Sequence, residues 1–197
     1  MEISAKEVME LRKTTGAGMM DCKKALLETN GDKTAAIKYL REKGISKAAK
    51  KAERATREGL IYSYIHANGK LGVLLEMNCE TDFVARNEIF VELCKNLAMH
   101  IAATDPIAID ESGLDQAKID AEAEIYRNKA LNDGKPEQII DRIVSGQVEK
   151  YKKSICLLSQ EFVKDPDKTV HDVITEAIVT LGENIQVGRF IRYSLGA

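Results

Sequence analysis

The feature that most constrains the fold is a predicted strand that gives way to a long helix across one short polar turn. Residues 71–77 are apolar enough for a strand, and residues 88–103 repeat apolar side chains at the spacing of an amphipathic helix. The turn between them is polar, yet it contains Phe83 directly after Asp82. Because connections on a rigid scaffold carry much of protein function, an aromatic side chain there is well placed to contact a partner.

A second interpretation of Phe83 is structural. Here Asp82 or Asn87 caps the following helix, and Phe83 packs beneath that helix as a hydrophobic staple. Local physical chemistry by itself favours this second interpretation. Both remain open on the residues alone.

The strand pattern predicts an α+β fold built around a small antiparallel sheet. Residues 60–65 alternate around Tyr62 and Tyr64, the Asn68-Gly69 pair predicts a hairpin turn, and residues 71–77 return. Residues 186–195 predict a closing strand after a helix over 169–181. Because a sheet of about three strands leaves an open edge, we expect it to pair with a second copy of the chain.

Strict alternation along the closing strand separates two sets of side chains. One face carries an aromatic side chain among small and polar ones: Gln186, Gly188, Phe190, Arg192 and Ser194. We expect this face to be covered, together with the edge, in a symmetric homodimer.

The first 58 residues predict a helical module followed by a linker. Ser4 and Glu7 form a capping box that starts a first helix, residues 19–28 predict a second, and residues 34–43 predict a third that ends at Gly44. We call residues 1–45 the N-terminal module; three short helices in this length resemble the ubiquitin-associated fold. Residues 46–58 are expected to form a charged linker helix, and residues 59–197 the α+β core.

Two adjacent methionines stand at the first turn of the predicted second helix. Neighbouring residues on a helix cannot both face inward, so at least one of Met19 and Met20 is expected to be exposed. An exposed methionine is a soft contact surface, although core filling is the structural alternative. Gly16 and Gly18 precede them, and one of the two is expected to adopt a positive φ in the tight turn.

A helical hairpin is predicted over residues 116–153. Residues 116–132 and 136–153 read as helices, and the Asp133-Gly134-Lys135 link between them is so short that they must run antiparallel. Because the surfaces of both helices are heavily charged, we expect the hairpin to project from the core rather than to lie buried in it.

Composition narrows the class of protein. The net charge of −2 combines +5 on residues 1–58 with −7 on the remainder, which suggests two surfaces with different partners. Direct nucleic-acid binding is disfavoured because tryptophan is absent and no aromatic residues interleave the basic residues over 47–57. No apolar run reaches membrane-spanning length and the first residues lack the features of a signal peptide, so a cytoplasmic protein is expected.

The cysteines and histidines show no pattern of metal or disulfide chemistry. The four cysteines form no CxxC pair, and the three histidines have no ligand spacing with them, so we expect reduced thiols, no metal and no cofactor. An enzyme that uses Cys79 or Cys94 with His100 is a remote alternative, because no residue is identifiable that would orient the base.

Two long segments carry a resemblance to a known family. The segment over 76–87, with Thr81-Asp82-Phe83-Val84 at its centre, closely resembles a signature of the bacterial-type translation elongation factor Ts family. The segment over 11–26 resembles that family's N-terminal signature. Similarity continues through residues 134–136, 162–166 and 188–192, so it covers nearly the whole chain.

The resemblance implies a guanine nucleotide exchange factor for elongation factor Tu, acting by protein binding and not as an enzyme. It implies that the N-terminal module grips the nucleotide-binding domain of that GTPase. The contact residues implied by the matching motifs are Arg12, Met19, Met20, Lys23, Thr81, Asp82, Phe83 and Val84. Of these, Asp82 and Phe83 are implied to reach the region of the Mg²⁺ and phosphate site.

The chain departs from the longer members of the family. It has one strand-hairpin unit where they have two, and it lacks their additional C-terminal helical module. Short members are expected to dimerise, which implies a two-plus-two complex with the GTPase. The competing hypothesis from another class is an adaptor like a ubiquitin-associated domain that binds a protein without affecting nucleotides; it suits the N-terminal module but does not explain the segment over 76–87.

Overall fold

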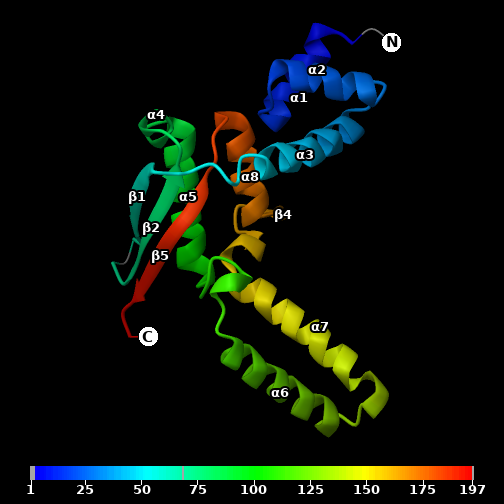
Figure 1. The fold of residues 1–197 in the computed structure, drawn as a ribbon, viewed down its shortest axis with the longest axis vertical. Helices are drawn as coiled ribbons and strands as arrows, with labels where there is room; N and C mark the ends of the chain where they lie inside the picture. The colour runs from blue at the N-terminus through cyan, green and yellow to red at the C-terminus, as the bar shows by residue number, and fades with distance from the viewer. Residues whose placement is uncertain (1–2, 68, 197) are drawn as a thin grey trace. The chain divides into compact units, whose positions relative to one another are not determined.

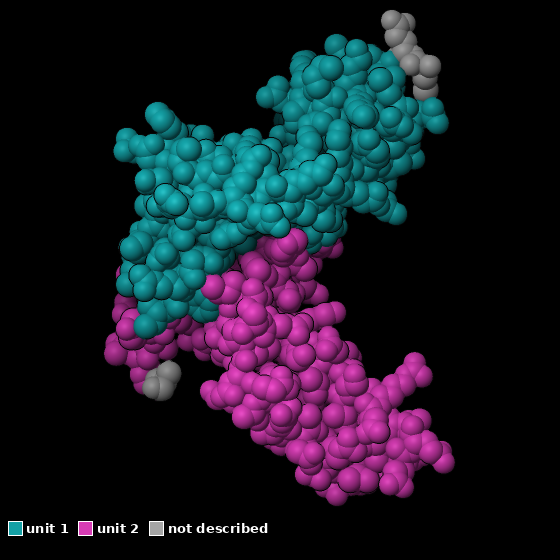
Figure 2. All heavy atoms as spheres, in the orientation of Figure 1, with its two compact units in different colours: residues 1–64, 74–98, 172–191 teal, residues 65–73, 99–171, 192–197 magenta. Residues whose placement is uncertain are grey.

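A computed structural model describes residues 3–67 and 69–196 of the chain, which divides into two compact units. Unit 1 comprises residues 1–64, 74–98 and 172–191, and unit 2 comprises residues 65–73, 99–171 and 192–197 (Figure 2). Helices are combined with a small antiparallel sheet, so the expected α+β class is confirmed (Figure 1). No helix within the described ranges has the length and hydropathy needed to cross a membrane.

The first three helices begin and end largely where their caps predict. They are α1 (Ala5–Thr15), α2 (Met19–Glu28) and α3 (Lys33–Ala49). Ser4 and Glu7 form the expected capping box, and Gly16 ends α1 with a φ of 66°, the left-handed conformation that glycine adopts readily. Asp32 caps α3 by accepting two backbone N–H groups. The three helices bury one shared cluster: Val8, Leu11, Ala17, Cys22, Ala25, Leu26 and Ala36.

The third helix is longer than predicted, so its expected end before Gly44 is wrong. Gly44 is buried in the middle of α3, where an added Cβ would lie 3.3 Å from Cγ2 of Val179 in α8 (Val170–Leu181). The glycine therefore permits a close approach of α3 to α8 rather than terminating a helix. A hydrogen bond of 2.6 Å from Arg41 to Asp172 joins the same two helices.

The separate linker helix expected over 46–58 is also wrong. Residues 46–49 are the last turn of α3, residues 50–53 form turns, and residues 54–57 form no helix before β1 (Glu58–Ile65) begins. These turns have backbone hydrogen bonds of their own, and side chains from the loop after α8 bond the same stretch of chain.

The main sheet has the order β1-β2-β5, with β2 (Leu71–Cys79) in the centre and β5 (Gln186–Ser194) at one side. The backbone N–H of Leu195 donates to the carbonyl of Lys70, while Gly188 lies beside Glu76 near the other end of β2. The strand β5 therefore runs antiparallel to β2. Within the predicted hairpin turn, Gly69 has a φ of 65°, and Asn68 lies outside the described residues.

One face of the sheet is buried and the other is open. Alternate residues of β2 are buried: Val73, Leu75, Met77 and Cys79. The helix α5 (Glu88–Thr104) lies along the sheet and is buried along one side, with Phe90 and Leu97 fully covered (Figure 1). On the open face, Ile61 and Leu74 are exposed.

The closing strand does not alternate strictly, which corrects the expected assignment of Phe190. Gly188 and Arg189 are both exposed, whereas Val187 and Phe190 on either side of them are half-buried. The alternation therefore shifts by one residue, as it does at a β-bulge. Consequently Phe190 is partly covered within the protein, whereas β5 exposes Ile191 and Tyr193.

Unit 2 contains the helical hairpin and a second, two-stranded sheet that the sequence did not predict. The hairpin helices α6 (Gln116–Asn132) and α7 (Glu137–Ile155) share a small core around Ala130, Ile140 and Val144. The strands β3 (Glu161–Phe162) and β4 (Asp165–Thr169) pair antiparallel. These strands are too short for any periodic pattern to identify.

Candidate functional site

The segment between β2 and α5 forms a single helical turn, α4 (Asp82–Ala85), which presents one aromatic side chain to solvent. Phe83 is 83% exposed, the most exposed large apolar side chain among the described residues. Val84 and Ala85, which follow it, are buried. The inward-facing residues therefore anchor the turn while Phe83 points outward. The staple interpretation, in which Phe83 packs beneath the helix, is wrong.

Thr81 and Asp82 have distinct places in this turn. Thr81 is the N-cap of α4, and its hydroxyl accepts the backbone N–H of Val84 at 3.4 Å. Asp82 is about half exposed and pairs with Arg86 at 3.1 Å. Of the four residues in the motif, Phe83 is the most exposed, Thr81 and Asp82 are partly buried, and Val84 is buried.

The turn is held by Glu183 and Asn184, two residues that were not predicted from the sequence. Glu183, in the loop between α8 and β5, accepts the backbone N–H groups of Glu80 and Thr81 at 3.1 and 3.0 Å and the Thr81 hydroxyl at 2.7 Å. In return, the carboxylate of Glu80 accepts the backbone N–H of Asn184 at 2.6 Å. Asn184 is buried, and no pattern in the sequence marks that burial or the contacts of this loop.

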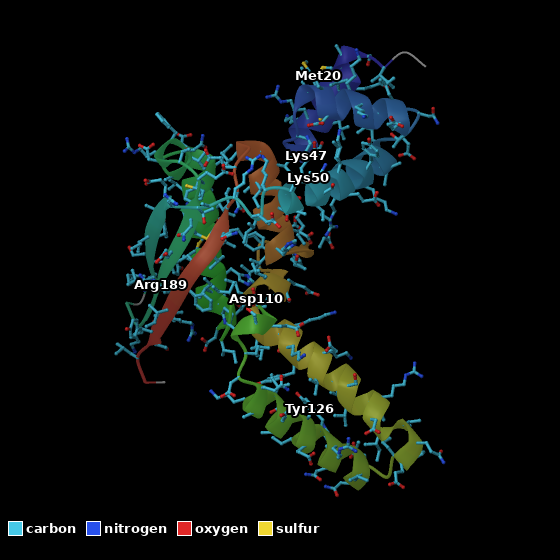
Figure 3. The ribbon with its side chains drawn as sticks, viewed as in Figure 1. Met20, Lys47, Lys50, Asp110, Tyr126 and Arg189 are labelled. Carbon is cyan, nitrogen blue, oxygen red and sulfur yellow. The ribbon has the colours of Figure 1, made fainter. Side chains whose placement is uncertain are left out.

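The N-terminal module presents its predicted contact residues on α1 and α2. Met20, which is labelled in Figure 3, is 77% exposed, and Met19 is 42% exposed, so the expectation that at least one faces solvent is confirmed. Arg12 and Lys23 are exposed as well. Behind them, Asp21 holds α2 against α3 through Lys43 and Lys47, at 3.0 and 2.7 Å, and these bonds hold the pKa of its carboxyl below the usual range. The exposed methionines therefore stand on a fixed helix.

The cysteines lack the properties of a nucleophile. All four are buried. Burial raises the pKa of the Cys79 thiol to about 11 and that of Cys94 to about 12, whereas a catalytic cysteine needs a lowered value. In the part of the chain that the structure describes, no group of three or more His, Cys, Asp or Glu side chains is arranged to hold a metal ion.

Comparison with known proteins decides between the remaining interpretations. A family model described as Elongation factor TS matches residues 4–197. The chain belongs to the elongation factor Ts family. It is 60% identical over 195 residues to elongation factor Ts of Oleidesulfovibrio alaskensis, covering 99% of this chain and 98% of that protein. It is 56% identical over 197 residues to elongation factor Ts of Nitratidesulfovibrio vulgaris, covering 100% and 98% respectively.

Membership of the elongation factor Ts family gives the chain the role of a guanine nucleotide exchange factor for elongation factor Tu in translation elongation. Members of this family are nucleotide exchange factors and not catalytic enzymes in the usual sense. The adaptor hypothesis, by contrast, assigned no role to an exposed aromatic on a turn outside the N-terminal module.

Proposed function

We propose that Asp82 and Phe83 form the element that enters the nucleotide-binding domain of elongation factor Tu and promotes GDP release by displacing contacts to Mg²⁺ and phosphate. The observation that carries this proposal is the exposure of Phe83 on a turn whose neighbouring residues are buried. A phenylalanine side chain has few rotatable bonds, so it supplies a large contact area at little entropic cost.

Exchange follows from linkage between the two binding events. If the factor binds nucleotide-free GTPase more tightly than the GDP form, then it must weaken GDP binding by the same ratio. A side chain that occupies space needed by the bound nucleotide or its Mg²⁺ produces such a difference. An exposed phenylalanine on an ordered turn can occupy that space, because the turn keeps the side chain in position when it contacts the GTPase.

We propose that the N-terminal module supplies affinity rather than displacement. Its three helices, the last of which ends at Ala49, are proposed to form a ubiquitin-associated-like domain, connected by the turns that follow to a core over 59–197 that includes the hairpin over 116–153. Arg12, Met19, Met20 and Lys23 form the proposed grip on the nucleotide-binding domain. Met20 offers apolar contact area, and the nearby cations suit an acidic surface on the partner.

We further propose that the chain forms a homodimer through the open face of its sheet and binds two copies of the GTPase. In unit 1 this face has a depression of about 390 Å³, lined by Ile61, Leu74, Glu76, Arg189, Phe190 and Ile191. Ile61 is 65% exposed, and Arg189, which is labelled in Figure 3, pairs with Glu76 at 2.7 Å. An apolar surface around one ion pair is suited to self-complementary two-fold packing.

The partner surfaces proposed here are protein surfaces, with no direct contact to nucleic acid or membrane, and the proposed location is the cytoplasm. The test of the exchange mechanism compares Phe83→Ala with Ile89→Ala, which removes another exposed apolar side chain from the start of α5. Release of a fluorescent GDP analogue from elongation factor Tu should slow strongly with Phe83→Ala and little with Ile89→Ala. Equal rates for the two variants would contradict the proposal.

A further inference from the structure

We propose that residues 182–186, which we call the clamp loop, position Phe83 for nucleotide exchange and tie its turn to the connection that leads from the N-terminal module, with Glu183 as the positioning residue. This inference rests on the proposed role of Phe83 in exchange. It assigns a function to side chains that do not themselves reach the partner.

Glu183 holds the turn through three hydrogen bonds to its carboxylate. One carboxylate oxygen accepts two consecutive backbone N–H groups, from Glu80 and Thr81, and the other accepts the Thr81 hydroxyl. Three donors on one carboxylate fix both the backbone and the side chain at the point where β2 ends. Hydrogen bonds to an ionised acceptor are stronger than bonds between neutral groups.

The Thr81 hydroxyl connects Glu183 to the helical turn that carries Phe83. Because the Thr81 hydroxyl donates its proton to Glu183, its lone pairs are left to accept the N–H of Val84. The carboxylate therefore sets the orientation of the cap of α4. A helix of one turn has little stability of its own, so the cap, together with the burial of Val84 and Ala85, holds the direction of Phe83.

A hydrogen bond in the opposite direction joins the clamp loop to the turn. Glu80 accepts the backbone N–H of Asn184 at 2.6 Å, while the backbone of Glu80 donates to Glu183. Two neighbouring residues of the clamp loop are thus bonded to two neighbouring residues of the turn. Rotation of the turn about a single bond would break contacts on both sides.

The clamp loop also bonds the residues that follow α3. Asn184 is 1% exposed and its amide donates to the carbonyls of Ala52 and Arg54, at 3.2 and 2.8 Å. Gln186 donates to the carbonyl of Ala52 at 3.1 Å, and Lys51 donates to the carbonyl of Gly182. The connection between the N-terminal module and β1 is therefore held by the same loop that holds the Phe83 turn.

The consequence is preorganisation of the two proposed contact elements. Ordering a loop at an interface reduces the affinity that its contacts would otherwise give. In this chain the clamp loop orders the Phe83 turn before the GTPase binds. A flexible turn would let Phe83 move aside when it meets the nucleotide site, so loss of the clamp should reduce displacement more than binding.

The test measures GDP release as a function of factor concentration for four full-length proteins: wild type, Glu183→Gln, Phe83→Ala and the double variant. Glutamine keeps the size of the side chain but replaces one acceptor oxygen with a donor. We expect Glu183→Gln to lower the maximal release rate about tenfold, which is the lower end of the loss for a hydrogen bond to a charged group. The half-saturating concentration should change less than the maximal rate.

The double variant distinguishes positioning from general stability. If Glu183 acts through Phe83, then Glu183→Gln should have no further effect on exchange in the Phe83→Ala background, while its effect on melting temperature should be the same in both backgrounds. An equal slowing of exchange in both backgrounds, or an unchanged maximal rate, would overturn the clamp. No effect of Phe83→Ala alone would instead refute the proposed function of Phe83.

Two further variants complete the test. If Glu183→Gln does not fold, Thr81→Val removes the hydroxyl link while leaving the backbone bonds, and should produce the same pattern. Asn184→Ala loosens the connection after α3, and should raise the half-saturating concentration more than it lowers the maximal rate, because the tethered elements lose effective concentration. The reverse pattern for Asn184→Ala would overturn the proposed tie to the N-terminal module.

Discussion

Replacing Phe83 with alanine removes a side chain that the free protein leaves almost entirely in water. A phenylalanine buries about 150–250 Å² when it enters an interface, and 83% of this residue is available in the free chain. At about 25 cal/mol per Å², and after allowing for the area that alanine retains, the loss is about 2–4 kcal/mol. This corresponds to a decrease of roughly 30-fold to 1000-fold in catalysed GDP release, since about 1.4 kcal/mol is tenfold in rate.

The same exposure predicts a small effect on folding. A substitution at an exposed position away from the core changes the free energy of unfolding by about 0.5 kcal/mol or less. Stopped-flow release of fluorescent GDP and thermal unfolding, measured on one preparation, therefore give opposite signatures for contact and core roles. A large fall in melting temperature with normal exchange would refute the reasoning, because it would mean that Phe83 packs inside the protein.

Three other perturbations test separate parts of the structure. Met20→Asp should weaken binding to elongation factor Tu about tenfold or more by isothermal titration, whereas Met9→Asp on α1 should not. In light scattering under reducing conditions, the wild type should have twice the 21.8 kDa monomer mass and Leu74→Glu should have the monomer mass; a monomeric wild type would contradict the dimer. Burial lowers the pKa of His100 below 6.5, so the unfolded chain binds more protons than the folded chain below that pH. The free energy of unfolding should therefore be constant above pH 6.5 and decrease below it. In urea titrations, His100→Gln should remove this dependence.

The histidine in that prediction shows how a buried polar group is satisfied. The Nδ1 atom of His100 accepts the backbone N–H of Val163 at 3.3 Å, and Nε2 lies 2.9 Å from Oε1 of Gln160. The ring is therefore neutral, with its proton on Nε2. A second proton on Nδ1 would face the N–H of Val163, which is the physical reason that acid should weaken this part of unit 2.

Local signals predicted most of the helices because their ends depend on neighbouring residues. The capping box at Ser4 and the cap at Asp32 involve contacts within three residues, so the sequence contains both partners. Gly44 shows the limit of this approach. A glycine that ends a helix and a glycine that admits a neighbouring helix are the same in sequence, and only the contact with Val179 separates them.

The sequence likewise predicted the residues of the site that lie in a local motif, but not those that contact it from distant parts of the chain. Sequence similarity identified Asp82 and Phe83, but whether Phe83 faces inward or outward depends on how Val84 and Ala85 are buried. Glu183 was not predicted, because it bonds residues 102 and 103 positions away and no local pattern marks such a contact. The shift of alternation at Gly188 and Arg189 likewise has no sequence signal that distinguishes it from a regular strand.

The most direct test of the central claim is the rate of fluorescent GDP release from elongation factor Tu, in excess unlabelled nucleotide, when the wild-type chain is added at one tenth of the GTPase concentration. An exchange factor acts repeatedly, so the account predicts that all of the bound nucleotide is released faster and with a single accelerated rate. Release at the intrinsic rate, or acceleration limited to a fraction equal to the amount of chain added, would contradict it.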